Sequence, residues 1–360
     1  MSEKPKYVVL HELGAGGMGM IHKGLLIGQA GFQRPIVIKR LRHSEDSGHV
    51  RLFVEEARRY ALLDHENIGR MFDFERVAGE LCIILEYIDG WSLVEFVERH
   101  RQLGRFPDVD LCVFIVSRVC RALQYVFETA AIVHRDISPS NIMMTREGAV
   151  KLIDFGIATR SGTRDSSLTG KPAYMAPEMV VELRADNRSD LFSLGVVFFE
   201  TLTRERLFDG HTTTEVLEQV IAGRDPAPGA LGASVPEACL EILRTALQRD
   251  PAQRFASAAA MGEACEHFLY DKGYGPTNLT LKEYLACLFP EAARPDPVPE
   301  AGFPVVEPTL IPIGDGERPR RPRHDDDTPV ALPRVATPAR SSAPGTLAPA
   351  TGRRPRRIKR

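Results

Sequence analysis

The chain has 360 residues, of which 43% are apolar and 26% charged, enough for a substantial core in one large or two modest domains. The six cysteines are scattered without a zinc-ligand spacing, and the amino terminus lacks the apolar core of a signal peptide. No apolar run approaches the roughly 20 residues that span a bilayer. We therefore expect a cytoplasmic protein, in which the cysteines are buried free thiols. The apolar runs that begin at Leu111 and Phe192 should form buried helices.

The first ninety residues combine strand patterns with one helical pattern. Short β-like apolar runs predict four strands: YVVLHEL from Tyr7, MIHKGLLIG from Met20, RPIVIKRL from Arg34 and LCIILEY from Leu81. Residues 49–63 predict a helix with an apolar stripe of Leu52, Ala57, Tyr60 and Leu63. Helical patterns dominate from Ser92 onward, apart from loop-rich residues 134–179. We therefore predict an α+β bilobal fold, with a small β-rich lobe at about 7–88 and a larger helical lobe at about 92–271.

The segment GAGGMG, from Gly14 to Gly19, matches G-x-G-x-x-G directly after the first predicted strand. A dinucleotide-binding fold uses this pattern to open a helix, whereas a β-like stretch follows here. A strand favours a flap over the phosphates of a nucleotide, because glycines let backbone N–H groups approach; a glycine-rich hairpin without a ligand is the alternative. The candidate binding residues of this flap are Gly14, Gly16, Gly17, Gly19 and Ile21.

Lys39 lies on the third predicted strand, in the sequence IVIK, twenty residues after Gly19. Its ammonium group can hold phosphates if an acidic residue fixes it, although a lone strand lysine is more often solvated. Glu56, on the predicted helix, is the preferred partner because it lies four residues before Tyr60 on the apolar stripe, whereas Glu55 faces another side.

The sequence HRDISPSN, residues 134–141, is followed by a strand-like run and then by DFG, residues 154–156. Phosphoryl transfer needs an acceptor for the hydroxyl proton, oxygen ligands for Mg²⁺ and cations beside the phosphates. Asp136 suits the first role, Asn141 and Asp154 the second, and Lys39 part of the third. Each residue alone could be a turn cap, but this order of motifs favours a catalytic site.

Residues 7 to about 271 thus resemble the eukaryotic-like Ser/Thr protein kinases found in bacteria. The resemblance implies transfer of the ATP γ-phosphoryl group to protein substrates, with Mg²⁺ or alternatively Mn²⁺. It implies that Phe155 packs under the Glu56 helix, that Glu178 of MAPE pairs with Arg254, and that Asp190 braces the catalytic loop. It also implies an adenine site: Glu86 and Ile88 offer backbone groups beside Leu85, and Leu13, Ile21, Val37 and Met143 enclose the ring.

Two positions depart from the family's usual spelling. Ser138 stands where the family has a lysine, and Lys171 stands where it has a threonine. We hypothesise a swap, in which Lys171 supplies the ammonium group and the Ser138 hydroxyl replaces the threonine contact. The alternatives are a solvated Lys171 and a nucleotide-binding pseudokinase that has lost transfer. A small-molecule kinase of related fold is a further rival, which the MAPE segment disfavours.

The polar stretch between Asp154 and Glu178 predicts an activation loop with hydroxyl residues Thr159, Ser161, Thr163, Ser166, Ser167 and Thr169. We predict phosphorylation at Thr163, Ser166, Ser167 or Thr169, by a second copy of the chain that associates with the first. Arg135 is a candidate partner for the added phosphate group.

The carboxyl-terminal part differs in composition from the rest. Residues 272–293 predict a short amphipathic extension that covers an apolar patch. Residues 294–360 contain 14 of the 26 prolines and carry a net charge of +5, which leaves −7 for the rest of the chain. We predict that this tail is disordered. Its basic end, RRPRRIKR, could contact nucleic acid, acidic lipid or an acidic protein face, or simply remain solvated.

Overall fold

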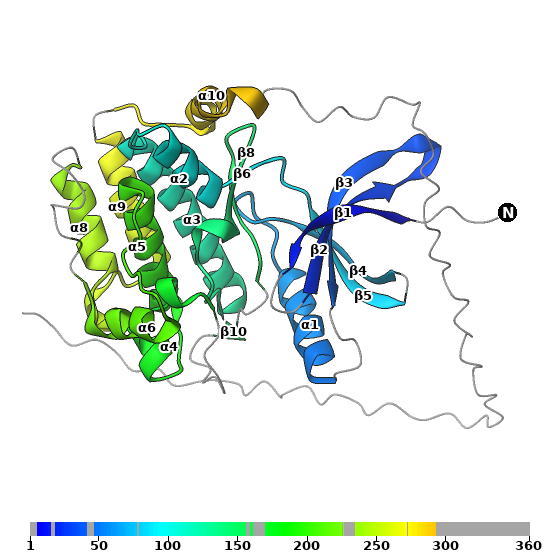
Figure 1. Cartoon of the computed structure of the whole chain (residues 1–360), viewed down its shortest axis with the longest axis horizontal. Coiled ribbons are helices and arrows are strands. Elements are labelled where there is room, and N and C mark those ends of the chain that lie inside the picture. Colours follow the sequence, from blue (N-terminus) through cyan, green and yellow to red (C-terminus); the bar gives the residue numbers. More distant parts are fainter. Residues whose placement is uncertain are drawn as a thin grey trace, which may run out of the picture. The chain divides into compact units, whose positions relative to one another are not determined.

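The structure is a computed structural model that describes residues 6–15, 19–41, 47–77, 79–155, 159–160, 170–224, 226, 235–271 and 273–292. They belong to one compact unit, Met1–Gly314, with a β-rich lobe and a helical lobe (Figure 1). This arrangement confirms the predicted α+β bilobal fold. The predicted tail 294–360, with its basic end, lies outside the described residues. Of the helices in the described ranges, none is long and apolar enough to cross a membrane.

The β-rich lobe is built on an antiparallel sheet with the strand order β1-β2-β3-β5-β4. Its strands are β1 (Tyr7–Ala15), β2 (Gly19–Ile27), β3 (Gln33–Leu41), β4 (Met71–Val77) and β5 (Glu80–Glu86). Four of them, β1, β2, β3 and β5, were predicted from their β-like apolar runs. The edge strand β4 was not, because its side chains are all partly or largely exposed and charged residues interrupt its apolar positions.

Helix α1 (Ser47–Tyr60) packs against this sheet. Phe53 and Ala57 are buried in one cluster with Leu41 of β3 and Ile83 of β5. The predicted position of Leu52 on this face is wrong: Leu52 is 40% exposed, because the buried face follows the helical spacing of Phe53, Ala57 and Tyr60. The same spacing buries Glu56.

The helical lobe contains most of the remaining elements. Its helices in the described ranges are α2 (Leu93–Gln102), α3 (Val109–Ala130), α4 (Pro177–Val181), α5 (Asn187–Thr203), α6 (Thr213–Ala222), α8 (Glu237–Ala246), α9 (Ala258–Tyr270) and α10 (Asn278–Leu288). The two apolar runs from Leu111 and Phe192 lie in α3 and α5 and are buried, as predicted. Asp108 and Asp186 begin these helices by accepting hydrogen bonds from backbone N–H groups of the first turn.

Two small sheets position the loops between the lobes. One sheet has the order β6-β8-β9, and the other pairs β7 with β10. The strands are β6 (Gly90–Ser92), β7 (Ile132–Val133), β8 (Ile142–Thr145), β9 (Val150–Leu152) and β10 (Thr159–Arg160). Short 3-10 turns complete the chain: η1 (Gln29–Gly31), η2 (Pro139–Asn141), η3 (Pro172–Tyr174), η4 (Pro251–Gln253) and η5 (Pro290–Ala292).

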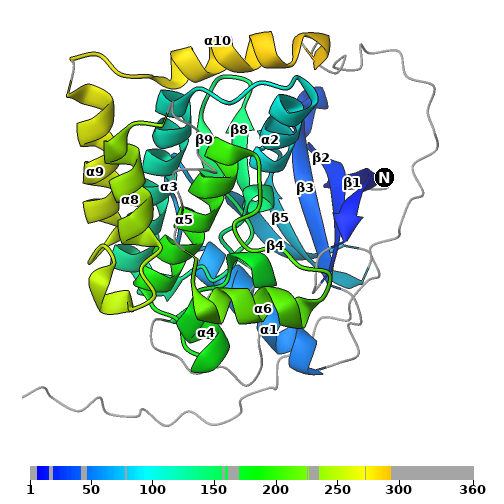
Figure 2. The same ribbon diagram turned by 60° about the vertical axis from the view of Figure 1, so that its left-hand side comes forward.

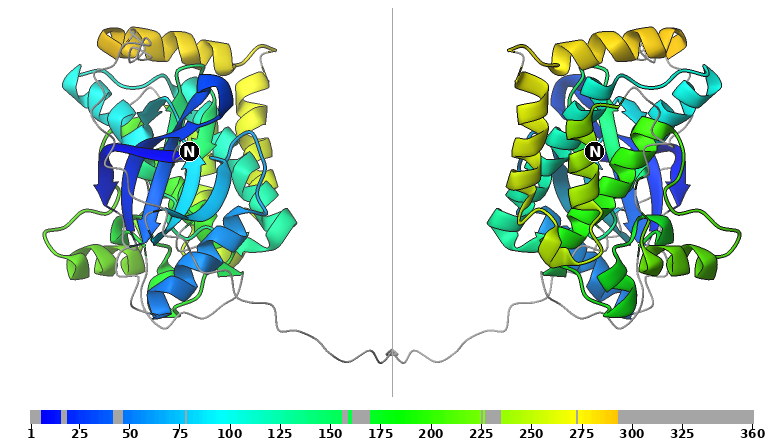
Figure 3. Two further views of the ribbon diagram at one scale, coloured as in Figure 1. Left: turned by 90° about the vertical axis from the view of Figure 1, so that its right-hand side faces the viewer. Right: turned by 90° about the vertical axis from the view of Figure 1, so that its left-hand side faces the viewer.

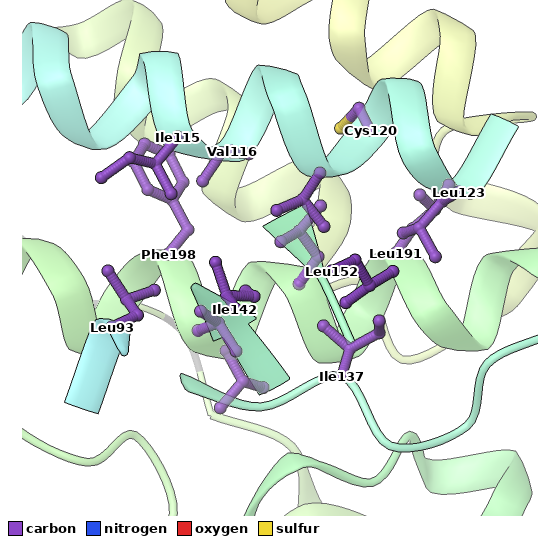
Figure 4. Packing of buried hydrophobic residues seen from close by; sticks show 14 of the residues in the cluster. Leu93, Ile115, Val116, Cys120, Leu123, Ile137, Ile142, Leu152, Leu191 and Phe198 are labelled. Atoms are coloured by element: carbon purple, nitrogen blue, oxygen red, sulfur yellow. The ribbon is translucent and has the colours of Figure 1, made fainter. Parts of the chain in front are cut away.

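The core of the helical lobe reaches directly to the loop that carries Asp136. Figure 4 shows Ile137 and Ile142 packed among side chains of α3 and α5. Both are fully buried, and each directly follows a candidate site residue, Asp136 or Asn141. Apolar burial therefore fixes the backbone of the loop immediately after each of these polar residues.

The cysteines are free thiols, and five of the six are buried as predicted. Cys287 is the exception, because it lies on the exposed face of α10.

Candidate active site

A cavity of about 690 Å³ lies between the two lobes. The β-rich lobe and the connection after it contribute Leu13, Ile21, Val37, Lys39, Glu86 and Ile88 to its lining. The helical lobe contributes Asp136, Asn141, Met143, Asp154 and Lys171. The structure therefore brings together candidate residues that lie up to 158 positions apart in the chain.

The glycine segment is only partly described. Gly16 and Gly17, like Gly156 of DFG, lie outside the described residues. Gly14 and Gly19 pair with Ile21 and Leu41 in the sheet. A Cβ atom on Gly19 would lie 2.1 Å from the carbonyl oxygen of Arg40. Close packing of β2 on β3 thus requires a glycine at this position, whatever its role toward a ligand.

Lys39 is held between two carboxylates. Its Nζ lies 2.6 Å from Glu56 Oε1 and 2.8 Å from Asp154 Oδ1. Burial lowers the pKa of Lys39, but the charges of Asp154 and Glu56 outweigh burial and raise it above the ordinary value. The rival partner Glu55 instead pairs with Arg59 at 3.1 Å. Lys39 is therefore a fixed ammonium group at the wall of the cavity.

The DFG segment is anchored by Phe155. Its buried ring packs edge-on against Tyr60 of α1, with 5.0 Å between ring centroids, and lies 4.6 Å from the ring of His134. Asp154 has a left-handed backbone with φ of 62°, a conformation that costs free energy for a residue other than glycine. The buried Phe155 ring and the ion pair to Lys39 hold Asp154 in this conformation.

The catalytic loop is braced from α5. Both oxygens of Asp190 accept hydrogen bonds from backbone N–H groups, of His134 at 2.7 Å and of Arg135 at 2.8 Å. Complete burial raises the pKa of Asp190 to about 7, while these two N–H donors favour its charged form. Arg135 has a left-handed backbone with φ of 70°, and this turn directs the following Asp136 into the cavity.

Asp136 and Asn141 contact each other directly. The Asn141 amide nitrogen donates to the Asp136 carbonyl at 2.7 Å and to Oδ2 of its carboxylate at 2.9 Å. The other carboxylate oxygen, Oδ1, is buried and has no hydrogen-bond partner in the described part of the chain. An unsatisfied carboxylate oxygen is costly, and it indicates a site for a proton or a cation.

Lys171 contacts the same carboxylate oxygen as Asn141. Its Nζ lies 2.8 Å from Asp136 Oδ2 and 2.9 Å from Ser138 Oγ. Ser138 is fully buried, whereas the Lys171 side chain is 44% exposed. The two positions that depart from the family's spelling are thus in direct contact beside Asp136.

The donor atoms at this end of the cavity suit a hard divalent cation. Since the Asn141 nitrogen donates to Asp136, its oxygen is the atom that could bind a cation, and the Asp154 carboxylate lines the same cavity. Mg²⁺ binds to proteins through a few such oxygens and keeps several waters. The residues therefore fit Mg²⁺, with the buried Asp136 oxygen as a further hard donor nearby.

The segment that follows Lys171 is tied to the helical lobe. Arg254, whose side chain is fully buried, donates to both oxygens of Glu178, at 2.7 and 2.8 Å. Ser189 donates to the same carboxylate at 2.7 Å. Tyr174 donates to the mostly buried carboxylate of Glu200 at 2.7 Å. These contacts give residues 171–178 a fixed course below the cavity.

Some lining residues were not candidates from the sequence, namely Tyr60, Gly69, Arg70, Tyr87, Ser140, Ile153 and Gly170. Tyr87 could have been inferred from its place between Glu86 and Ile88. Ser140 lies within HRDISPSN, Ile153 directly before DFG and Gly170 directly before Lys171. Tyr60 lies on the predicted helix, whereas Gly69 and Arg70 come from a segment without a motif. Of the hydroxyl residues of the activation loop, Ser161, Thr163, Ser166, Ser167 and Thr169 lie outside the described residues.

Comparison with known proteins gives a family match. The family model described as protein kinase domain matches residues 7–268. Over 298 residues the chain is 34% identical to the tyrosine-protein kinase MasK of Myxococcus xanthus, covering 79% of this chain and 46% of MasK. It is 31% identical to the serine/threonine-protein kinases PrkC of Bacillus subtilis and PknL of Mycobacterium tuberculosis, covering 71% and 72% of this chain. The matches span 39% of PrkC and 65% of PknL, so this chain covers less than two thirds of each relative.

Proposed function

Because this chain belongs to the protein kinase family, whose domain model matches residues 7–268, we propose that it transfers the γ-phosphoryl group of ATP to Ser and Thr hydroxyls of protein substrates. The observation that carries the proposal is the convergence of Lys39, Asp136, Asn141 and Asp154 on one cavity. Positioned charge of this kind is the main requirement of phosphoryl transfer.

Nucleotide binding uses the β-rich side of the cavity together with Met143 of the helical lobe. Apolar side chains of Leu13, Ile21, Val37 and Met143 enclose the adenine ring, and the backbone of Glu86 and Ile88 supplies polar contacts to its edge. Gly14, Gly16, Gly17 and Gly19 form the flap over the phosphates. Lys39, held by Glu56 and Asp154, contacts the phosphates. The lining of the cavity by both the apolar and the charged residues supports this orientation.

Transfer uses the helical side of the cavity. Asp136 accepts the proton of the substrate hydroxyl, and Lys171 places positive charge beside the reacting phosphate. Mg²⁺, held by Asn141 and Asp154, would neutralise charge on the phosphates. Members of this family use ATP and Mg²⁺, and Mn²⁺ has the same preference for oxygen ligands.

The class of the acceptor hydroxyl is proposed from the names of the relatives. Two of the relatives described above are named serine/threonine-protein kinases, and MasK is named a tyrosine-protein kinase. We propose Ser and Thr as acceptors, including Thr163, Ser166, Ser167 or Thr169 of a second copy during autophosphorylation. The location proposed is the cytoplasm, where ATP is available.

The test is transfer of labelled phosphate from ATP to a generic protein substrate, followed by identification of the phosphorylated amino acid. We expect phosphoserine and phosphothreonine from the wild type, and a fall of at least about 100-fold in turnover for Asp136→Asn. Wild-type turnover in Asp136→Asn would refute the role of Asp136. Detection of phosphotyrosine alone would show that the acceptor is tyrosine and not serine or threonine.

A further inference from the structure

Helix α10 and the turn η5 lie beyond residue 268, where the family match ends. In Figures 2 and 3 the helix runs along one side of the helical lobe, beside α2. Leu281, Leu285 and Leu288 form its buried face. The described contacts tie it to the lobe near its start, in its middle and at its end.

The start of α10 touches the turn between β8 and β9. A Cβ atom on Gly148 would lie 1.9 Å from the carbonyl oxygen of Asn278, so the helix backbone approaches this turn as closely as a glycine allows. Lys282 forms an ion pair with Glu147 in the same turn. The strand β8, which carries Met143, is therefore held from outside at its far end.

The middle of α10 is fixed by a partly buried hydrogen bond. The Tyr284 hydroxyl lies 2.7 Å from Nε2 of His100, a residue of α2 that is 1% exposed. His100 Nδ1 lies 2.7 Å from the Phe96 carbonyl. Since a carbonyl can only accept, Nδ1 is the protonated nitrogen, and Nε2 accepts from Tyr284. This chain of bonds fixes the rotation of α10 on α2.

The end of α10 places an aromatic ring on the connection between the lobes. Phe289 stacks on Trp91 of β6, with 4.6 Å between ring centroids and 8° between planes. Arg99 of α2 donates to the carbonyl of Leu288 at 3.0 Å, which positions the following Phe289. The Arg146 guanidinium lies 5.1 Å from the Trp91 ring, and its Nε lies 2.9 Å from Asp89 Oδ1.

Trp91 is one strand away from the wall of the nucleotide cavity. In the antiparallel pair of β6 and β8, Trp91 is opposite Met144 and Ser92 is opposite Met143. Met143 lines the cavity, as does Ile88, three residues before Trp91. The strands are so close at Gly90 that a Cβ atom there would lie 1.9 Å from the Met144 carbonyl oxygen. A shift of Trp91 would therefore move the strand that presents Met143.

From this continuous series of contacts we infer that residues 273–292 form a brace for the nucleotide site, in which Phe289 and Trp91 are positioning residues that set the affinity for ATP. The inference rests on the proposed function for its ligand. Neither ring lines the cavity. They act by fixing the backbone between Ile88 and Ser92 and its partner strand, so that the adenine contacts are in place before binding.

The experiment compares full-length wild type with Phe289→Ala. The affinity for MgATP is measured by calorimetry, and the KM values for ATP and for a protein substrate are measured separately. We expect ATP affinity to weaken and KM for ATP to rise by about three- to tenfold, the range set by the strength of an aromatic pair. The KM for the protein substrate and kcat at saturating ATP should stay within about twofold, because the catalytic loop is anchored elsewhere.

Two controls separate a brace from general destabilisation. Leu279→Ala changes an apolar residue on the same helix that is 60% exposed, and it should leave ATP affinity unchanged. Phe289→Leu retains an apolar side chain without the flat ring, and should weaken ATP binding by about two- to threefold even if Phe289→Ala fails to fold. Trp91 is the single tryptophan of the chain, so a shift in its fluorescence reports directly that the stack has been removed.

The outcomes distinguish the brace from the kinase activity. Equal ATP affinity in wild type and in the folded Phe289 variants overturns the brace and leaves the proposed function intact. A wild type that binds ATP but transfers no phosphate, together with weaker ATP binding by the Phe289 variants, overturns the proposed function and supports the brace. Failure of the wild type to bind ATP overturns both.

Discussion

Two lysines reach the same cavity from opposite lobes, and they are held in different ways. Lys39 belongs to a strand, its side chain is 6% exposed, and its ammonium group lies between the carboxylates of Glu56 and Asp154. The Lys171 side chain is 44% exposed and lies on a loop, with contacts to Asp136 and Ser138. A buried ion pair on regular secondary structure fixes the position of a charge, whereas a half-exposed ammonium on a flexible stem can follow its partner during a reaction. The comparison suggests that Lys39 orients the bound nucleotide and that Lys171 acts on the reacting phosphate.

The largest effect should come from Lys39→Met, which removes the fixed charge. We expect turnover to fall by at least about 100-fold, because an oriented charge is lost and Glu56 and Asp154 are left facing each other. Steady-state kinetics and MgATP calorimetry would measure the effect. The matched control is Arg244→Ala in α8, which removes a cation from the surface of the protein. A Lys39→Met variant with more than a tenth of wild-type turnover would remove the contrast between the two lysines.

A smaller effect, of about 10- to 100-fold in kcat, is expected for Lys171→Ala. Affinity for MgATP should change by less than about threefold, since this lysine contacts Asp136 and not the Glu56 pair. The double variant Ser138→Lys with Lys171→Thr should recover most of the lost turnover, because the ammonium would return from the neighbouring loop. Near wild-type turnover in Lys171→Ala would instead mean that Lys171 is only a solvated loop residue.

The smallest effect should be the pH dependence that comes from Glu56, the partner of Lys39. Burial raises the pKa of Glu56, and the Lys39 ammonium opposes this shift. The pKa of Glu56 in the folded protein therefore lies above the unfolded value of 4.5. As the pH falls through the folded pKa toward the unfolded one, Glu56 becomes protonated in the folded protein first, which stabilises the fold. The neutral Glu56 also holds the Lys39 ammonium group less tightly. As the pH is lowered, we expect kcat/KM to decline while the midpoint temperature of unfolding does not.

Glu56→Gln imitates the protonated form of this pair. It should lower kcat/KM by about tenfold at neutral pH and remove the part of the acid decline that comes from Glu56. Measurement of kcat/KM and of thermal unfolding between about pH 5 and 8 would show both. An unchanged acid limb in Glu56→Gln would assign the decline to another group.

The sequence determined the main elements and the order of the chemical groups. The strand patterns of the sequence predicted β1, β2, β3 and β5, whose apolar side chains contribute to the core of the β-rich lobe. They could not predict β4, since an edge strand buries too little of either side. The helical period predicted α1 but assigned Leu52 to its buried face. Phe53 occupies that face, because the direction in which a helix turns its stripe depends on the sheet it packs against.

The order of motifs was sufficient to predict Glu56 as the partner of Lys39. Asp154 was predicted only as an oxygen ligand for Mg²⁺, and its contact with Lys39 came from the tertiary structure. Only the tertiary structure decided that Lys171 contacts Asp136 and Ser138, because nothing in local spacing fixes the distance between two loops 33 residues apart. The same holds for Phe289 and Trp91, which are 198 residues apart in the chain. Local patterns report burial and charge along the chain, whereas contacts between distant segments are selected by the packing of the whole core.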